Sequence, residues 1–244
     1  MTMRRDAVAL LSGGLDSAVA LAAARGQGEG EIVLALTADY GQVAASREIA
    51  AARAIASALG VPHRVVALPF LAEAMMGGRP HPLVDASVAP PEPSAAEIER
   101  GGEAARRSAE AVWVPNRNGL LVNVAAAFAE ATGASRVVTG FNREEAETFP
   151  DNSLAFVEAA NRALALSTRT GVRVESPTAA LDKKDIVALG RKLGAPIERI
   201  WSCYRSGPRM CGRCESCRRL KRALSAASCL EWFTETGGHE GFSQ

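Results

Sequence analysis

Cysteine is absent from the first 202 residues of this 244-residue chain, and all five cysteines lie after that point. Four of them fall within fifteen consecutive residues. The start of the chain has two arginines and an apolar stretch that is too short for a secretory signal and runs into a glycine-rich loop. Clustered cysteines without an export signal favour a metal site in a reducing cytoplasm over disulfides.

A long apolar run and an excess of charge are also missing. No stretch of about 18 apolar residues occurs, so we expect no transmembrane helix. The formal net charge of +1 gives no general reason for binding to a membrane surface or to nucleic acid. One basic cluster near the C-terminus is interpreted as a solvated helix face beside the metal site: Arg213, Arg218, Arg219, Lys221 and Arg222.

What the sequence does contain is an alternation of apolar segments with helix-forming segments, without an internal repeat. This alternation predicts an α/β fold with a doubly wound, parallel five-stranded sheet. We expect the core to span residues 1–194, followed by a small C-terminal zinc-binding unit at 195–244. Strands are predicted at 6–11, 32–38, 63–68, 136–140 and 172–176, and helices at 17–24, 44–59, 119–132, 153–167 and 183–193.

Residues 70–112 interrupt this alternation. Five of the twelve prolines lie between positions 80 and 93, and a charged stretch follows them. The sequence therefore predicts a long loop or a partly ordered insertion, which in a compact domain is either functional or mobile.

A glycine-serine loop, Ser12-Gly13-Gly14-Leu15-Asp16-Ser17, follows the predicted first strand. Doubly wound folds bind their ligands at this point, at the carboxyl ends of the strands. The glycines permit close approach of the backbone to phosphate oxygens, and the N-terminus of the next helix offers free N–H groups. The loop has no Gly-Lys-Ser/Thr ending, so chemistry at the γ-phosphate is less expected. The alternative is a simple turn in which Asp16 or Ser17 caps the helix.

The longer stretch LLSGGLDSAVAL resembles the signature of the PP-loop ATP pyrophosphatase superfamily, which has an adenine nucleotide alpha hydrolase-like fold. Enzymes of this superfamily cleave ATP between the α- and β-phosphates and transfer AMP to an oxygen of the substrate. The resemblance implies that the loop binds the ATP phosphates with Mg²⁺ and that the end of the second strand contacts the adenine. The implied ATP-binding residues are Leu11, Ser12, Gly13, Gly14, Leu15, Asp16, Ser17, Leu36, Thr37, Ala38, Tyr40 and Gln42.

The cysteine cluster has the spacing Cys203-x7-Cys211-x2-Cys214-x2-Cys217. Four thiolates suit tetrahedral Zn²⁺, and a closed four-cysteine shell is structural because no position remains for water. An iron–sulfur cluster is the competing interpretation, because C-x2-C-x2-C also opens the bacterial ferredoxin pattern. The fourth cysteine lies upstream here, which favours zinc. Cys229 stands apart and is interpreted as a small buried apolar residue.

Several further stretches resemble the 7-cyano-7-deazaguanine synthase family, which combines the SGG-x-DS loop with a C-terminal four-cysteine zinc site. The resemblance implies an ATP-consuming C–N ligase of queuosine biosynthesis that acts on ammonia and a deazapurine carboxylate through adenylated acid and amide intermediates. It also implies a homodimer. The stretches extend over nearly the whole chain and read DYGQ at 39–42, VPNRN at 114–118, TG at 139–140, FPD at 149–151, SP at 176–177, DK at 182–183 and CY at 203–204.

The same stretches contain the candidate site residues. Arg117 can donate a two-pronged hydrogen bond to a carboxylate or phosphate, and Lys183 can offset charge on a departing pyrophosphate. Glu147 and Asp151 can accept hydrogen bonds from a guanine-like ring. Surface salt bridges are the alternative for Lys183 and Glu147, and a structural loop contact is the alternative for Arg117. The implied catalytic residues are Asp16, Arg117 and Lys183, and the implied substrate-binding residues are Arg117, Asn118, Gly140, Glu147, Phe149 and Asp151.

Two departures from the family pattern fall where the deazapurine is expected to bind. Family members usually have glycine in place of Asn116, but asparagine tolerates a left-handed conformation best among the other residues, so we expect the turn to survive. Asn152 and Ser153 replace the usual cysteine and arginine. A relative with these changes could stop at the amide or act on another carboxylate, including one on a protein.

Two other classes of function fit parts of the sequence. A tRNA-modifying PP-loop enzyme needs a reactive cysteine or an iron–sulfur cluster and a nucleic-acid-binding face, which the net charge of +1 argues against. A zinc-stabilised nucleotide-binding module without catalysis is disfavoured by the intact loop together with Arg117 and Lys183.

Overall fold

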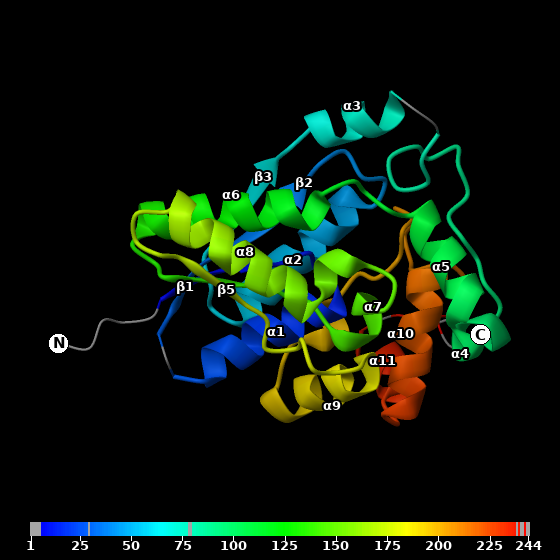
Figure 1. Cartoon of the computed structure of the whole chain (residues 1–244). Coiled ribbons are helices and arrows are strands. Elements are labelled where there is room, and N and C mark those ends of the chain that lie inside the picture. Colours follow the sequence, from blue (N-terminus) through cyan, green and yellow to red (C-terminus); the bar gives the residue numbers. More distant parts are fainter. Residues whose placement is uncertain (1–5, 29, 78–79, 238, 240–241, 243–244) are drawn as a thin grey trace.

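The computed structural model describes residues 6–28, 30–77, 80–237, 239 and 242. Its five parallel strands form one sheet in the order β3-β2-β1-β4-β5 (Figure 1), so the predicted fold class is confirmed. The order of winding reverses between β1 and β4, which is where doubly wound sheets bind ligands. The strands are β1 (Ala7–Leu10), β2 (Ile32–Asp39), β3 (His63–Ala67), β4 (Arg136–Val138) and β5 (Arg173–Glu175).

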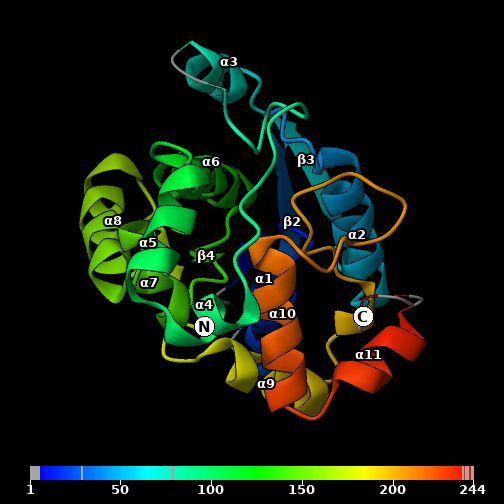
Figure 2. The same ribbon diagram turned by 90° about the vertical axis from the view of Figure 1, so that its right-hand side faces the viewer.

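Helices cover both faces of the sheet, because alternate residues of a buried strand point to opposite sides. Ala7 and Ala9 of β1 pack into one apolar cluster with α1, α2 and α9, whereas Val8 packs into a second cluster with α6 and α8 (Figure 2). Within the described residues, no helix has both the length and the apolar character needed to span a bilayer. The helices that cover the sheet are α1 (Leu15–Gly26), α2 (Ala45–Ala58), α6 (Arg117–Thr132), α8 (Leu154–Ser167) and α9 (Lys183–Leu193).

The segment 70–112 is more regular than the long loop expected from its prolines. The prolines at 80–93 stay in irregular structure, but the alanine- and glutamate-rich part after them is helical. Ser94 and Glu97 form a reciprocal capping box that starts this helical part. The helices of the segment are α3 (Phe70–Met76), α4 (Ala95–Arg100) and α5 (Gly102–Ala111).

The C-terminal residues pack beside α9. The apolar cluster of α1 and α2 continues through Trp201 and Met210 to Leu220 and Leu224 of α10, so the described C-terminal residues share buried surface with the core. The remaining elements are α7 (Arg143–Ala146), η1 (Pro150–Asn152), η2 (Ile197–Arg199), α10 (Glu215–Ala226) and α11 (Leu230–Thr236).

The turn before α6 depends on Asn116, which has φ +54° and ψ +24°. The expectation that asparagine preserves a left-handed turn here is confirmed. Gly119 makes room for the Asn116 side chain, since a Cβ at Gly119 would lie 2.2 Å from Asn116 Oδ1. The turn sets the direction in which Arg117 and Asn118 enter the helix.

We expect Asn116→Val to lower the free energy of unfolding by about 1–2 kcal/mol, because a β-branched side chain is strained at positive φ. Asn116→Gly is expected to stay within about 0.5 kcal/mol of the native protein, since glycine adopts this conformation freely. Urea denaturation followed by circular dichroism measures both. Equal losses for valine and glycine would show that the asparagine side chain, and not the backbone angle, holds the turn.

Candidate active site and metal centre

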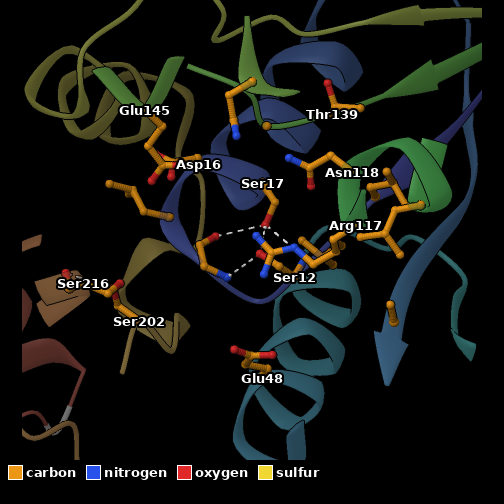
Figure 3. A pocket seen from close by; sticks show the side chains of 18 of the residues that line it. Ser12, Asp16, Ser17, Glu48, Arg117, Asn118, Thr139, Glu145, Ser202 and Ser216 are labelled. Atoms are coloured by element: carbon orange, nitrogen blue, oxygen red, sulfur yellow. Dashed lines mark hydrogen bonds between the residues drawn. The ribbon is translucent and has the colours of Figure 1, made fainter. Parts of the chain in front are cut away.

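A cavity of about 290 Å³ opens at the carboxyl ends of β1, β2 and β4. It brings together the glycine-serine loop, the end of β2 and the starts of α6 and α9 (Figure 3), which are distant in sequence. Most of the residues proposed from the sequence line it: Leu11, Ser12, Gly14, Leu15, Asp16, Ser17, Leu36, Ala38, Tyr40, Gln42, Arg117, Asn118, Gly140, Phe149 and Lys183.

Four proposed residues do not line this cavity. Gly13 is the loop residue that packs against α2. Thr37 is buried in the sheet, and its Oγ1 donates to the Leu11 carbonyl oxygen over 2.6 Å. Glu147 lines a neighbouring cavity between α5 and α10. Asp151 lies in η1, directly before a residue of the cavity wall.

Two close backbone contacts hold the glycine-serine loop. Gly13 has φ +84°, and a Cβ there would lie 2.4 Å from the backbone oxygen of Glu48 in α2. At Gly140, after β4, a Cβ would lie 2.6 Å from the backbone nitrogen of Ser17. A side chain at either position would push these elements apart. The head of α1 is therefore held between α2 and the end of β4.

Serine hydroxyls close the loop from within, as the dashed lines in Figure 3 show. Ser12 Oγ and Ser17 Oγ lie 3.0 Å apart, and Ser17 Oγ also donates to the Gly14 carbonyl oxygen over 3.1 Å. Gly14 is the N-cap of α1, and no side chain caps the helix. The simple capped turn considered as the alternative is therefore not what forms, and the head of α1 faces the cavity.

Lys183 is the centre of a buried ion cluster. Its Nζ lies 2.7 Å from Asp16 Oδ2 and 2.7 Å from Glu145 Oε1. Burial raises the pKa of Asp16 to about 6, although Lys183 acts in the opposite direction. Burial also acts to raise the pKa of Glu145, but there Lys183 outweighs it and the pKa falls. Asp16 Oδ1 is buried without a hydrogen-bond partner among the described residues, so this oxygen is available to a cation.

The raised pKa of Asp16 predicts a pH-dependent difference between the native protein and Asp16→Asn. The folded pKa of about 6 exceeds the ordinary value of 3.8, so the folded state holds this proton more tightly than the unfolded state. The native protein should therefore lose stability relative to Asp16→Asn as the pH rises from about 4 to 6, with a plateau above about 7. Urea denaturation across this range measures the difference, and a constant difference would contradict the assignment.

Glu145 is a cavity residue that was not among the candidates from the sequence. Asn142 caps α7, and its Oδ1 accepts a hydrogen bond from the Glu145 N–H over 2.9 Å. The N-x-x-E spacing is a helix-start pattern that marks Glu145 as a residue held at the head of a helix. Its pairing with Lys183 has no local signal.

Arg117 lies across the loop from Asp16 and Glu145 (Figure 3). Its Nη1 donates to Tyr40 Oη over 3.2 Å. Burial acts to lower the pKa of Arg117, but Tyr40 and nearby carboxylates, including Glu48, outweigh it and raise the pKa. Arg117 is thus a permanent cation in the wall. Glu48, also missed from the sequence, lines the same cavity.

Asn152 and Ser153, which replace the family's usual cysteine and arginine, have different roles. Asn152 is buried and lines the cavity, and its Nδ2 donates to Asp151 Oδ1 over 3.4 Å. Ser153 instead caps α8, where its Oγ accepts from the Phe156 N–H over 3.1 Å. Only Asn152 changes the space available to a ligand.

The four clustered cysteines form a metal-binding arrangement. One Sγ atom from each of Cys203, Cys211, Cys214 and Cys217 lies within 4.8 Å of all the others. Backbone N–H groups of Cys211 and Cys214 donate to cysteine sulfurs over 3.4 and 3.3 Å. Such donors stabilise thiolates, so this set of side chains fits a metal ion held by four sulfurs. Gly212, with φ +68°, makes the turn between them.

We expect Cys214→Ser to reduce bound metal from about one ion per chain to well below half and to lower the thermal midpoint by about 5 °C or more, because structural metal binding contributes to folding. Cys229→Ser is the matched control, since Cys229 lies outside the cluster and its thiol donates to the Ala227 carbonyl oxygen. Elemental analysis and scanning calorimetry measure both effects. Full metal content in Cys214→Ser would rule out the four-sulfur site.

The reversed sheet order, the glycine-serine loop at the head of α1 and the cysteine cluster together define an α/β protein of the PP-loop class with four C-terminal cysteines that could hold a metal ion. The family model described as "Queuosine biosynthesis protein QueC" matches residues 6–228, and the chain belongs to this family.

Curated relatives named 7-cyano-7-deazaguanine synthase agree with the family model. The protein from Desulforudis audaxviator is 54% identical over 226 residues, which cover 90% of this chain and 96% of the relative. The protein from Desulforamulus reducens is 53% identical, covering 90% of this chain and 93% of its own. The protein from Bdellovibrio bacteriovorus is 48% identical, covering 93% and 96%.

Proposed function

We propose that this protein is an ATP-dependent ligase that converts 7-carboxy-7-deazaguanine and ammonia into 7-cyano-7-deazaguanine, with release of AMP and pyrophosphate. The observation that carries the proposal is the loop at 12–17, which lies in one cavity with Arg117 and Lys183. Family membership and the relatives' names support the choice of substrate.

In the first step, a carboxylate oxygen of the substrate attacks the α-phosphorus of ATP, and the bond to the β-phosphate breaks. We assign the phosphates to the amides and hydroxyls of the loop at 12–17 and the adenine to the end of β2. Arg117 orients the substrate carboxylate, and Lys183 offsets the charge of the departing pyrophosphate. The free Oδ1 of Asp16 fits the Mg²⁺ that accompanies ATP.

In the second step, ammonia attacks the acyl carbon, AMP leaves, and loss of a proton gives the amide. A second ATP is attacked by the amide oxygen, again with release of pyrophosphate. Loss of AMP and of the remaining N–H protons then leaves the nitrile. The protein's part is positioning and charge stabilisation, with Asn118, Gly140, Phe149 and the neighbouring Asp151 around the deazapurine.

The remaining features of the proposal follow from the family resemblance and the donor set. We assign the four-cysteine site to structural Zn²⁺ because a closed set of four thiolates suits that ion. We also propose free ammonia as the nitrogen source, a cytoplasmic location, a homodimer and a division into a core at 1–194 and a zinc-binding unit at 195–244.

The purified protein, given ATP, Mg²⁺, ammonium and 7-carboxy-7-deazaguanine, should release AMP and form the nitrile, as measured by mass spectrometry. Arg117→Lys should reduce kcat/KM for the acid by about a hundredfold, because lysine keeps the charge but loses the planar fork. Arg25→Lys, on the exposed end of α1, is the matched control.

Release of ADP and inorganic phosphate would overturn the proposed adenylation. Accumulation of the amide without nitrile would limit the activity to the first half of the reaction. In that case Asn152→Cys, which restores the family's usual side chain in the cavity wall, tests whether this one position is responsible.

A further inference from the structure

The cysteine cluster places polar side chains in the wall of the active-site cavity. Ser202 and Tyr204 flank Cys203, and Ser216 directly precedes Cys217. These three residues line the same cavity as the loop at 12–17, and Figure 3 shows the two serines next to each other. The metal centre and the ATP site therefore share a stretch of backbone.

The two serines form a hydrogen-bonded pair in which one of the two hydroxyl protons is not used within the pair. Ser202 Oγ and Ser216 Oγ lie 2.8 Å apart, so one hydroxyl donates to the other. The Ser202 Oγ also lies 3.4 Å from the Ser216 carbonyl oxygen. If Ser202 donates within the pair, the Ser216 proton is free to point into the cavity. In the reverse arrangement, the Ser202 proton is free for a ligand or for the longer contact to the carbonyl oxygen.

The pair is tied to the phosphate side of the cavity. The backbone N–H of Trp201, directly before Ser202, donates to the Gly13 carbonyl oxygen over 2.9 Å. Ser216 lies in the first turn of α10, where the helix dipole adds partial positive charge. Hydroxyl donors beside the loop and near a helix N-terminus match phosphate oxygens, whereas the adenine is assigned to the end of β2.

We propose that Ser202 and Ser216 bind the β- and γ-phosphates of ATP and hold the pyrophosphate as it leaves. This inference rests on the proposed function, because it deepens the ATP site assigned there. The cysteine cluster then acts as a positioning device: a metal ion bound by Cys203 and Cys217 fixes the backbone that carries both hydroxyls.

Binding of nucleotides to the double variant Ser202→Ala/Ser216→Ala tests the proposal without catalysis. Isothermal titration calorimetry with Mg²⁺ present should show ATP and pyrophosphate binding weakened by about tenfold, because hydrogen bonds to charged phosphate oxygens are lost. AMP, which lacks the β- and γ-phosphates, should bind as it does to the native protein. Ser225→Ala, an exposed serine on the same helix, is the matched control.

Three measurements make the result decisive. Metal content of the double variant must equal that of the native protein, so that loss of the metal site is separated from loss of the hydroxyls. Equal weakening of ATP and AMP, or no change for ATP and pyrophosphate, would overturn the assignment. A weakened affinity for 7-carboxy-7-deazaguanine with unchanged ATP affinity would also overturn it and would place the serines at the acid. These binding results are independent of whether the nitrile product forms, so failure of the proposed function is recognised separately.

Discussion

The start of α1 contacts α2 and the end of β4 through glycine backbone, with no side chain between them. The rest of the site depends on this close approach. Gly13 lets α2 touch the loop, and Gly140 lets the end of β4 touch the first turn of α1. Parallel strands already deliver their carboxyl ends to one edge of the sheet. Because no Cβ intervenes, the loop, the end of β2 and the heads of α6 and α9 lie close enough to line one cavity.

This packing also separates the charges in the cavity. Lys183 is shared by Asp16 and Glu145 on one side of the loop, and Arg117 lies on the other side beside Tyr40 (Figure 3). A buried lysine with two carboxylates leaves a net negative cluster that suits a cation-bearing triphosphate. An arginine across the loop suits the negative carboxylate of a second substrate. In the proposed adenylation, the ATP and the acid would thus meet oppositely charged parts of the same cavity.

The segment that contains the four clustered cysteines forms part of the cavity wall. It also contacts the core through residues that do not line the cavity. Arg219 of α10 pairs with Glu144 of α7 over 3.0 Å, and Arg222 contacts the same carboxylate. The backbone N–H of Glu215 donates to the Pro91 carbonyl oxygen, which connects α10 to the segment before α4. The basic residues interpreted as a solvated face are thus partly structural. Arg219 and Arg222 hold α10 against the core, while Arg213 is exposed and Arg218 is half-buried.

The sequence by itself determined the features that depend on local spacing. The strand and helix alternation defined the sheet, and α9 was predicted with its observed ends; the loop at 12–17 and the cysteine spacing were recognisable as they stand. The helices at 95–111 were not predicted, because the prolines and glycines of 70–112 favour a loop while the local start signal is only the capping box at Ser94.

Only the tertiary structure decided which side chains share the cavity. It paired Glu145 with Lys183 and placed Glu147 in a different cavity. It also added Glu48, Ser202 and Ser216 to the lining of the active-site cavity. These outcomes depend on the direction in which a side chain points after distant elements have packed. Periodicity along the chain records which face of an element is buried, but it carries no information about which distant residue that face will meet.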